Sequence, residues 1–514
     1  MRIGIDFGTT RIVVARADRG NYPLVNFEAP DGHVRDWFPS LLAVSERERV
    51  YGWEALEKQG EPGWTVIRSL KRQLRTAGPL SEMEIADQRF NVSLLVTEMM
   101  EALHRELLHS STLGARKYDR LQAMLGVPAN ANSNQRFLTE QAAENAGFEV
   151  LGLLNEPSAA AIEFVYRSSK ERKNQEKGGL LVYDLGGGTF DVSLVTLGET
   201  EHTVIASEGI PDMGGDDFDE MLALLALEQA GRPAQGESTL TAAEWYRLFD
   251  ECREKKESLN PNSRRIAVDL ERVRKDWREV SIGVETFYER CRPLVEASSK
   301  VAENLLGAHP NHAVDTLYLT GGGSELPPVA RVLRETFGRK VRRSAYMRSA
   351  TAIGLAIRAE GHEDRPFRDQ FTKNFGVWRE ADDGDKVVFD VIFPRGAKLP
   401  SRGEQPLRTV RLYHPAHNIG HFRYLECAQL GANNQPEGEI SNWDEIRVAF
   451  DPSLRDSENL ANLPVLRHGR IEERWFEEEY TCDANGDVKV KICDRTTERS
   501  NEYRLGRWSK HHKK

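Results

Sequence analysis

The feature that most constrains the fold of this chain is an apolar run that leads into an aspartate and then into a glycine turn, and it occurs twice. The first copy is "RIGIDFGTTRIVVARA" (2–17) and the second is "LLVYDLGGGTFDVSLVTL" (180–197). Each predicts two β-strands around a turn, because the flanking runs are short, rich in β-branched residues and bounded by Gly. Glycine loses the most backbone freedom on folding and packs nothing, so its repeated use indicates a need for bare backbone.

A third glycine turn follows a further apolar run, in "TLYLTGGGSELPPV" (316–329), and it lacks the acid. Between these strand groups, apolar residues recur at helical spacing over 94–108, and helices are also predicted over 133–147, from 156 onward and over 349–360. Strand groups with helices between them predict an α/β architecture in two similar halves.

The pattern changes after residue 360. The segment "GHEDRPFRDQFTKN" (361–374) is polar and reads as a linker. Beyond it, alternating segments and turn signals replace helical spacing, and "ANGD" (484–487) predicts a hairpin because Asn-Gly suits positive φ. We therefore expect an α/β domain over 1–360, a linker over 361–374, an antiparallel β domain over 375–506 and a basic tail over 507–514.

Composition narrows the function classes. The net charge of -10 argues against a general nucleic-acid binder. No apolar run approaches the ~20 residues needed to cross a bilayer, and the N-terminus lacks the pattern of a secretory signal. The five cysteines form no CxxC pair, which favours free thiols in a reducing compartment and argues against zinc. The sequence thus predicts a cytoplasmic protein without nucleic-acid or membrane partners.

The glycine turns indicate a chemistry. A bare turn lets backbone N–H groups approach a polyanion closely. Asp6 and Asp184 would repel phosphate unless a divalent cation lay between, and Mg²⁺ commonly bridges carboxylates to phosphates. Two such turns therefore predict a Mg²⁺–nucleotide held between two lobes, with the uncharged third turn at the ribose and base. Neither hairpin has the GxxxxGK[ST] form, so this is not a P-loop protein.

The motifs, in order and approximate spacing, resemble the ATPase of the seventy-kilodalton heat-shock (DnaK-type) chaperone family, in the actin and sugar-kinase superfamily. They are "IGIDFGTT", "VPANANSNQR", "NEPSAAA", "VYDLGGGTFDVSLV", "MGGDDFDEML" and "LTGGGSELPPV". The resemblance covers most of residues 1–360. It implies a two-lobed actin-like (ribonuclease H-like, duplicated) ATPase domain followed by a smaller all-β sandwich.

The resemblance also implies roles for residues around ATP or ADP. The phosphate loops would be Gly8, Thr9 and Thr10, and Gly186, Gly187, Gly188 and Thr189. A hairpin that closes over the nucleotide would contain Gly214, Gly215 and Asp216. The nucleoside would contact Lys256, Asn260, Gly321, Gly322, Gly323 and Ser324.

For catalysis, the resemblance implies that Asp6, Asp184 and Asp191 hold Mg²⁺ through its waters. The candidate catalytic residues are Lys71, Glu156, Asp184 and Thr189, and the pair that relays the nucleotide state to the partner domain is Pro128 and Arg136. Two simpler interpretations stay open. Glu156 also fits a carboxylate favoured by a helix start, and Lys71 also fits a solvated lysine in a basic run.

The chain departs from the family's pattern at Arg253, where an acid is usual, at Glu325, where a base is usual, and at Arg348, where an acid is usual. These three are either surface residues or a pocket in which charges are exchanged and pairing is kept. The linker holds "RPFR" where the family has aliphatic residues, so one phenylalanine replaces several leucines. No helical lid is expected after the β domain.

The resemblance implies a Mg-ATP-hydrolysing chaperone that binds unfolded or extended polypeptide, with J-domain co-chaperones and nucleotide-exchange factors as partners. An exposed strand edge in the β domain would bind extended peptides through main-chain hydrogen bonds. The alternative is a nucleotide-gated regulatory or scaffold protein whose β domain has one dedicated partner. An actin-like filament protein is disfavoured by the separate β domain, and a sugar kinase by the lack of a substrate domain between the lobes.

Overall fold

The computed structural model of this protein describes residues 1–78, 80–116, 118–171, 178–232, 240–260, 262–361, 365–381, 386–401, 403–455, 457, 459–467 and 473–505. Residues 362–364 of the expected linker, and the expected tail at 507–514, lie outside this range. Contacts group the chain into two compact units. The first contains Met1–Ala131 and Leu138–Phe367, and the second contains Asn132–Phe137 and the residues from Arg368 onward.

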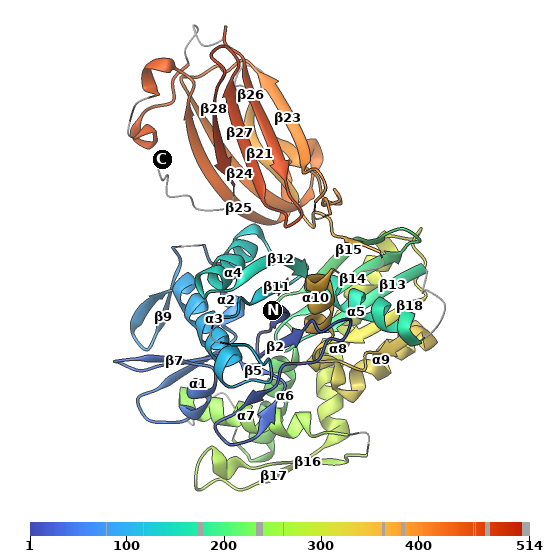
Figure 1. The fold of residues 1–514 in the computed structure, drawn as a ribbon. Coiled ribbons are helices and arrows are strands. Elements are labelled where there is room, and N and C mark those ends of the chain that lie inside the picture. The colour runs from blue at the N-terminus through green and yellow to red at the C-terminus, as the bar shows by residue number, and fades with distance from the viewer. Residues whose placement is uncertain are drawn as a thin grey trace. The chain divides into compact units, whose positions relative to one another are not determined.

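The first unit contains two larger sheets (Figure 1). The first sheet has the order β12 (Glu149–Asn155), β11 (Gln122–Val127), β1 (Arg2–Phe7), β2 (Arg11–Arg16) and β5 (Phe38–Pro39). The second has the order β19 (Val341–Arg343), β18 (Thr316–Thr320), β13 (Gly178–Leu185), β14 (Phe190–Leu197), β15 (His202–Ile210) and β20 (Phe367–Arg368).

The two sheets share one topology. In the first, β1 pairs antiparallel with β2 and parallel with β11. In the second, β13 pairs antiparallel with β14 and parallel with β18. Each acid–glycine motif therefore forms the hairpin at the centre of its own sheet, as the repeat in the sequence predicts.

Helices cover these sheets and join them. They are α1 (Trp53–Glu57), α2 (Leu70–Gln73), α3 (Val92–His109), α4 (Ser133–Asn145), α5 (Glu156–Glu171), α6 (Gly215–Gln229), α7 (Ala242–Glu257), α8 (Val284–Ala308), α9 (Pro327–Phe337) and α10 (Ala350–Glu360). Smaller sheets contain β3 (Phe27–Glu28), β4 (Val34–Arg35), β6 (Leu41–Val44), β7 (Arg49–Tyr51), β8 (Thr65–Arg68), β9 (Glu82–Ile85), β10 (Gln88–Asn91), β16 (Arg265–Val268) and β17 (Val280–Gly283).

Strand β13 is buried on both faces. Leu180 and Val182 pack into a core with residues of α5 and α10, whereas Leu181 and Tyr183 pack into a second core with residues of α6 and α8. Alternate side chains of a strand point to opposite faces, so helices on both sides exclude water from this sheet. That is why the run "LLVY" (180–183) is apolar throughout.

Helix α10 lies close against β1. A Cβ on Gly4 of β1 would lie 2.3 Å from the backbone nitrogen of Ala356, and one on Gly354 would lie 1.8 Å from the carbonyl oxygen of Ala159 in α5. Real Cβ atoms do not approach backbone this closely, so both positions need glycine. This close packing fixes the position of β1, which carries Asp6 near its C-terminal end, against helix α10.

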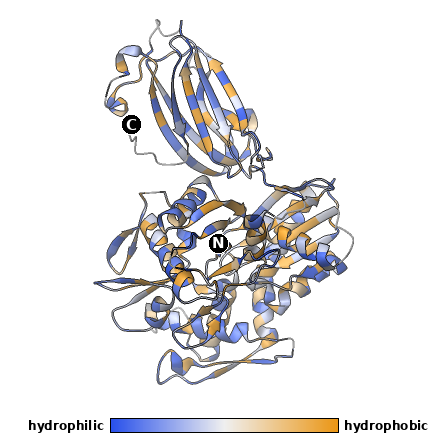
Figure 2. Ribbon diagram, in the orientation of Figure 1, coloured by the Kyte–Doolittle hydropathy of each residue, from blue (hydrophilic) through white to orange (hydrophobic). Residues whose placement is uncertain are grey.

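The second unit is a β-sandwich. One sheet has the order β22 (Lys386–Phe393), β21 (Asn374–Ala381), β24 (Ile419–Leu430) and β25 (Pro436–Ala449), and the other has β23 (Leu407–Tyr413), β26 (Phe476–Cys482), β27 (Val488–Asp494) and β28 (Arg499–Arg504). Both are antiparallel. Apolar and polar residues are mixed along these strands (Figure 2), and the alternation is most regular in β26, whose residues are buried and partly exposed in turn, as expected for a sheet with one wet face.

The predicted hairpin at 484–487 is present. It joins β26 to β27, and Gly486 has a φ of +81°. The Asp483 side chain accepts hydrogen bonds from the backbone N–H groups of Asn485 and Asp487, at 2.9 and 3.1 Å, which closes the turn. The fold class predicted from sequence, an α/β unit followed by a β unit, is therefore confirmed.

Candidate nucleotide site

The turns of the two central hairpins meet. We call Gly8, Thr9 and Thr10 the first turn, and Gly186–Thr189 the second turn. A Cβ on Gly187 would lie 2.3 Å from Thr10 Oγ1, and one on Gly188 would lie 2.7 Å from Thr9 Cγ2. Glycine is therefore required here because the two turns approach each other, and the bare backbone that the sequence indicated is present.

A cavity with about 1070 Å³ of empty space lies along these turns and opens to solvent. Its lining contains most of the residues predicted from sequence, namely Asp6, Gly8, Thr9, Thr10, Lys71, Glu156, Asp184, Gly186, Gly187, Thr189, Gly215, Asp216, Lys256, Gly321, Gly322 and Gly323. These come from both sheets and from α2, α5, α6 and α7, so the fold assembles one site from segments up to about three hundred residues apart.

Carboxylates gather at the cavity: Asp6, Glu156 and Asp184 line it. Asp191, predicted from sequence as a Mg²⁺ residue, is buried near Glu156 and does not line the cavity. Burial and the nearby Glu156 carboxylate raise the pKa of Asp6 to about 7 and that of Asp191 to about 7. Burial, followed by Glu156 and Asp6, also raises the pKa of Asp184 well above its ordinary value. Carboxylates crowded in this way favour a cation among them.

One lysine faces this cluster. Lys71, on α2, forms an ion pair with Glu156, and both side chains are nearly excluded from solvent. Burial alone would lower the pKa of Lys71, but Glu156 and Asp6 raise it above its ordinary value. Lys71 is thus a buried partner of the site and not a solvated lysine.

Glu156 is the first residue of α5 and follows β12 directly. The simpler interpretation, a carboxylate at a helix start, therefore holds for its backbone position. Its side chain nevertheless lines the cavity and is bound to Lys71, so the helix start aims this carboxylate at the site.

The start of α6 closes against the second turn. The N–H groups of Gly215 and Asp216 donate to the carbonyl oxygens of Gly186 and Gly187, at 2.9 and 2.7 Å. A Cβ on Gly214 would lie 2.6 Å from the backbone of Gly187. Gly214 does not line the cavity itself; it lets α6 approach the second turn.

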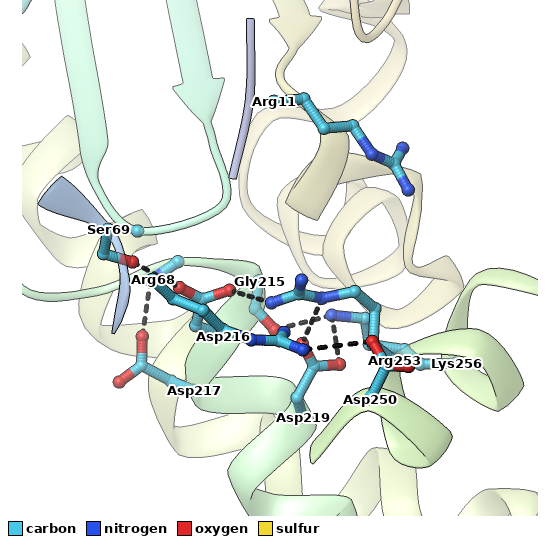
Figure 3. A network of polar contacts seen from close by, with 12 residues as sticks. Arg11, Arg68, Ser69, Gly215, Asp216, Asp217, Asp219, Asp250, Arg253 and Lys256 are labelled. Carbon is cyan, nitrogen blue, oxygen red and sulfur yellow. Dashed lines mark hydrogen bonds and ion pairs between the residues drawn. The ribbon is translucent and has the colours of Figure 1, made fainter. Parts of the chain in front are cut away.

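Charged side chains of α6 and α7 point toward one another beside the cavity (Figure 3). Lys256 donates to Asp219 and to the carbonyl oxygen of Gly215, both at 2.6 Å. Arg253 pairs with Asp216 at 2.9 Å and with Asp219 at 3.3 Å, and it lines the cavity. Arg253 is therefore not a surface residue; it balances the acids at the start of α6.

The third turn, Gly321–Ser324, lies against the second. Gly321 has a φ of +86°, and a Cβ there would lie 2.3 Å from Asp184 Oδ1, while a Cβ on Gly323 would lie 2.8 Å from the Gly186 carbonyl oxygen. Ser324 is fully buried and its Oγ has no hydrogen-bond partner, but it does not line the cavity.

Two further predicted contacts lie elsewhere. Asn260 is exposed on the turn after α7, where its side chain accepts from the N–H of Asn262 at 3.0 Å, so the structure does not bring it to the cavity. Gly188 lies behind the first turn, and its carbonyl oxygen accepts from Arg72 at 2.8 Å. Helix α7 ends at Glu257, so Asn260 lies beyond the helix that brings Lys256 to the cavity.

The predicted relay residues are separate from the cavity lining. Pro128 follows β11 directly, and Arg136 lies in α4. Their relay role stays a prediction.

Of the two interpretations left open for Glu325 and Arg348, the pairing of exchanged charges is present, but only Arg348 lines the cavity. Arg348 donates to Glu325 at 2.5 Å and to Glu257 at 3.2 Å, and Arg11 donates to Glu257 at 2.6 Å. Arg11 also lies over the ring of Trp37 at 4.7 Å. Arg11, Trp37 and Glu257 all line the cavity and were missed from sequence; the position of Arg11 directly after the first turn was the available signal.

The residues fit a Mg²⁺–triphosphate. Thr10 Oγ1 is buried without a hydrogen-bond partner, the glycine turns leave backbone accessible, and the carboxylates outnumber the cations on the floor. Among the described residues, no cluster of three or more His, Cys, Asp or Glu side chains could hold a metal ion by direct coordination. The expectation of Mg²⁺ contacts through water stays a prediction.

Two global properties follow from the same structure. All five cysteines are buried and unpaired, as the sequence predicts. Within the described part of the chain, no helix is long and apolar enough to span a bilayer.

Comparison with known proteins places the site in context. A family model described as "Hsp70 protein" matches residues 2–369. The chain is 27% identical over 531 residues to chaperone protein DnaK of Deinococcus deserti, which covers 98% of this chain and 78% of that protein. It is 29% identical over 507 residues to chaperone protein DnaK of Thermotoga petrophila, covering 96% and 78%. It is 31% identical over 521 residues to the chaperone protein HscA homolog of Vibrio parahaemolyticus, covering 96% and 76%.

Proposed function

The chain belongs to the Hsp70 family, and on that premise we propose that it is a chaperone that couples Mg-ATP hydrolysis to the binding and release of extended polypeptide. The observation that carries the proposal is the cavity between the two hairpin turns, with buried carboxylates and Lys71 on its floor. This arrangement supports phosphoryl transfer to water, because that reaction needs positioning and charge stabilisation more than covalent help.

Each group has a role in this proposal. Asp6, Asp184 and Asp191 would hold Mg²⁺, which supplies positive charge to the phosphates when bound. Lys71 adds a second positive charge at the transferring group. Glu156, fixed by its ion pair with Lys71, orients the attacking water.

The hydroxyl groups of the turns complete the site. The hydroxyl of Thr10 is buried and free to donate to a phosphate oxygen, and Thr189 lines the cavity at the second turn. The N-terminus of α6 faces the same turn, and its positive dipole end favours an anion nearby.

The β-sandwich supports the polypeptide-binding part of the proposal. Besides the core, a second apolar cluster is present on the sheet of β21, β22 and β24. It contains Phe389, Leu425 and Cys427 with Trp378, Val391 and Leu430. Val377 belongs to the sandwich core and Trp378 to this cluster, so the cluster lies on the opposite sheet face. Its central side chains, Phe389, Leu425 and Cys427, are buried, so an apolar segment would contact the partly buried members of the cluster.

The test measures binding on the full chain. Calorimetric titration with Mg-ATP should show saturable binding that depends on Mg²⁺, and Asp184→Asn should abolish turnover. A fluorescent library of extended peptides should then show broad apolar binding that loosens with ATP.

Two outcomes contradict the proposal at different levels. If the chain shows no Mg-dependent binding of a purine triphosphate, the proposed ATPase activity is refuted. If the chain binds nucleotide but no peptide of the library, the result favours a nucleotide-gated regulatory protein with one dedicated partner. J-domain co-chaperones and exchange factors are the partners to test after a positive result.

A further inference from the structure

We propose that the outer edge of strand β19 is a docking site for an extended acidic peptide segment, held by an exposed basic patch. The patch consists of Arg334, Arg339, Lys340, Arg342 and Arg343, all of them exposed. None of the five belongs to the described lining of the nucleotide cavity, so this inference does not rest on the proposed function.

The patch concentrates positive charge in a chain that is acidic as a whole. The ten residues from Arg334 to Arg343 contain five Lys or Arg and one acid, whereas the full chain has a net charge of -10. That acid, Glu335, is already paired with Arg292 at 2.9 Å. The segment therefore offers a local positive charge that its own acid does not cancel.

Four of the five cations have no acidic partner in the part of the chain that the structure describes. Arg334, Arg339 and Lys340 form no ion pair there. Arg343 donates to the backbone carbonyl oxygen of Glu325 at 3.0 Å, and not to a carboxylate. A ligand with carboxylates would thus meet cations that it does not have to take from another acid.

The backbone at the patch is an open sheet edge. Among the described strands, β19 is the outermost of the second sheet and pairs only with β18. Such an edge presents N–H and C=O groups that an added strand can pair with. Val341 is buried in the core with residues of α9, which anchors the strand. Neighbouring side chains point to opposite faces, so Arg342 and Arg343 place one cation on each face of the edge.

Charge and edge together favour a short acidic peptide over a larger polyanion. Charges are screened over about 8 Å at physiological ionic strength, so a short peptide would interact mainly with the patch. An anionic bilayer or a nucleic acid would also approach the acidic remainder of the surface and be repelled by it. Neither of these offers a backbone strand to pair with the edge.

Protection of the edge explains the patch less well. Charged side chains on an edge strand keep it from pairing with another sheet, and short strands serve the same purpose. Strand β19 has only three residues, so one charge would be enough. Arg334, in the last turn of α9, also balances the negative end of that helix. Arg339 and Lys340 lie beyond the helix end at Phe337 and need another explanation.

The experiment measures fluorescence anisotropy of a labelled peptide of alternating Glu and Val on the full chain. Arg339→Gln with Lys340→Gln should weaken binding about 5-fold, as expected for the loss of two exposed ion pairs. Arg89→Gln with Lys275→Gln is the matched control, because it removes the same charge at two exposed positions outside the patch. We expect it to change the affinity less than about 2-fold. Thermal melts check that each variant is folded.

A second peptide tests the strand edge on the unchanged protein. Alternating Glu and Pro keeps the charge of the first peptide but removes the N–H group at every second residue. It should bind at least about 3-fold more weakly if the peptide pairs with β19 as a strand. Equal affinity for the two peptides would overturn the docking at a strand edge.

The remaining outcomes also decide the inference. Equal losses in the two double variants, or no binding of the Glu-Val peptide, would overturn it. Vesicles of phosphatidylserine and phosphatidylcholine that bind through the patch, while the peptide does not, would overturn the acidic peptide as the partner. Mg-ATP binding should be the same in the patch variant and the wild type, so a failure of this inference and a failure of the proposed function are distinguishable.

Discussion

The buried ion pair of Lys71 and Glu156 allows stability and catalysis to be separated. Their side chains are 7% and 10% exposed. Removing one partner of a buried pair leaves an uncompensated charge and costs about 3–5 kcal/mol, whereas replacing both with neutral groups is close to neutral. We therefore expect Lys71→Met to destabilise the first unit by about 3 kcal/mol, and Lys71→Met with Glu156→Gln to return within about 1 kcal/mol of the wild type.

We expect the double variant to recover the stability of the wild type but not its rate of ATP hydrolysis. Both variants lack the positive charge that we propose Lys71 supplies to the transferring phosphate, and loss of one such electrostatic contact slows catalysis about 10²–10³-fold. Differential scanning calorimetry measures the unfolding of the units, and single-turnover phosphate release measures hydrolysis. Lys58→Met is the control, because Lys58 and Glu61 form an exposed pair at 3.1 Å whose loss should change stability by less than about 1 kcal/mol.

Two results would refute this reasoning. If the double variant melts as early as Lys71→Met, the destabilisation does not come from an unpaired carboxylate. If Lys71→Met hydrolyses ATP at the wild-type rate, Lys71 has no role in charge stabilisation at the site.

Three further predictions follow from single contacts. Gly214→Ala should weaken Mg-ATP binding about 10-fold or more, because the added Cβ would displace the second turn. Gly307→Ala is the control and should leave binding unchanged, because there is open space around Gly307. Calorimetric titration measures both affinities. Burial, followed by the charge of Arg365, lowers the pKa of His202 from 6.5 to about 4. The stability that neutral His202 contributes is therefore complete above pH 6.5 and is lost as the pH falls toward 4. His202→Phe should reduce the loss of stability between about pH 7 and about pH 5, as measured by thermal melts at the two values. In the β-sandwich, Glu478→Ala should cost about 1–3 kcal/mol, because the Arg379 guanidinium loses one of its two carboxylate partners and keeps Asp390 at 2.7 Å. Arg379→Met with Glu478→Leu should recover most of this loss in urea melts.

The elements that sequence reasoning predicted are those with a strong local signal. The two acid–glycine hairpins, the third turn and helix α3 each show periodicity or glycine spacing within one short window. The hairpin at 484–487 follows from Asn-Gly alone, because few other dipeptides tolerate that backbone. Local backbone preference was therefore enough for these elements.

Strand β25 shows where alternation failed as a signal. The charges of "EISNWDEIRVAF" fit no simple period, and the structure shows that β24 and β25 shift register at Tyr424/Leu425 and again at Cys427/Gln429. A register shift inserts an extra residue and reverses which side chains face the core. Such shifts depend on the partner strand, so one strand read alone does not reveal them.

The amino-acid sequence alone contains the paired acid–glycine turns, and from them it predicts a phosphate-binding site with carboxylates beside bare backbone. What surrounds these turns depends on the folded structure: the burial that raises the pKa of Asp184, the pairing of Lys71 with Glu156, and the ion pair of Arg348 with Glu257. The physical reason is distance along the chain. Turn chemistry acts over a few residues, whereas Coulomb energies and desolvation depend on groups that lie close together only after the chain has folded.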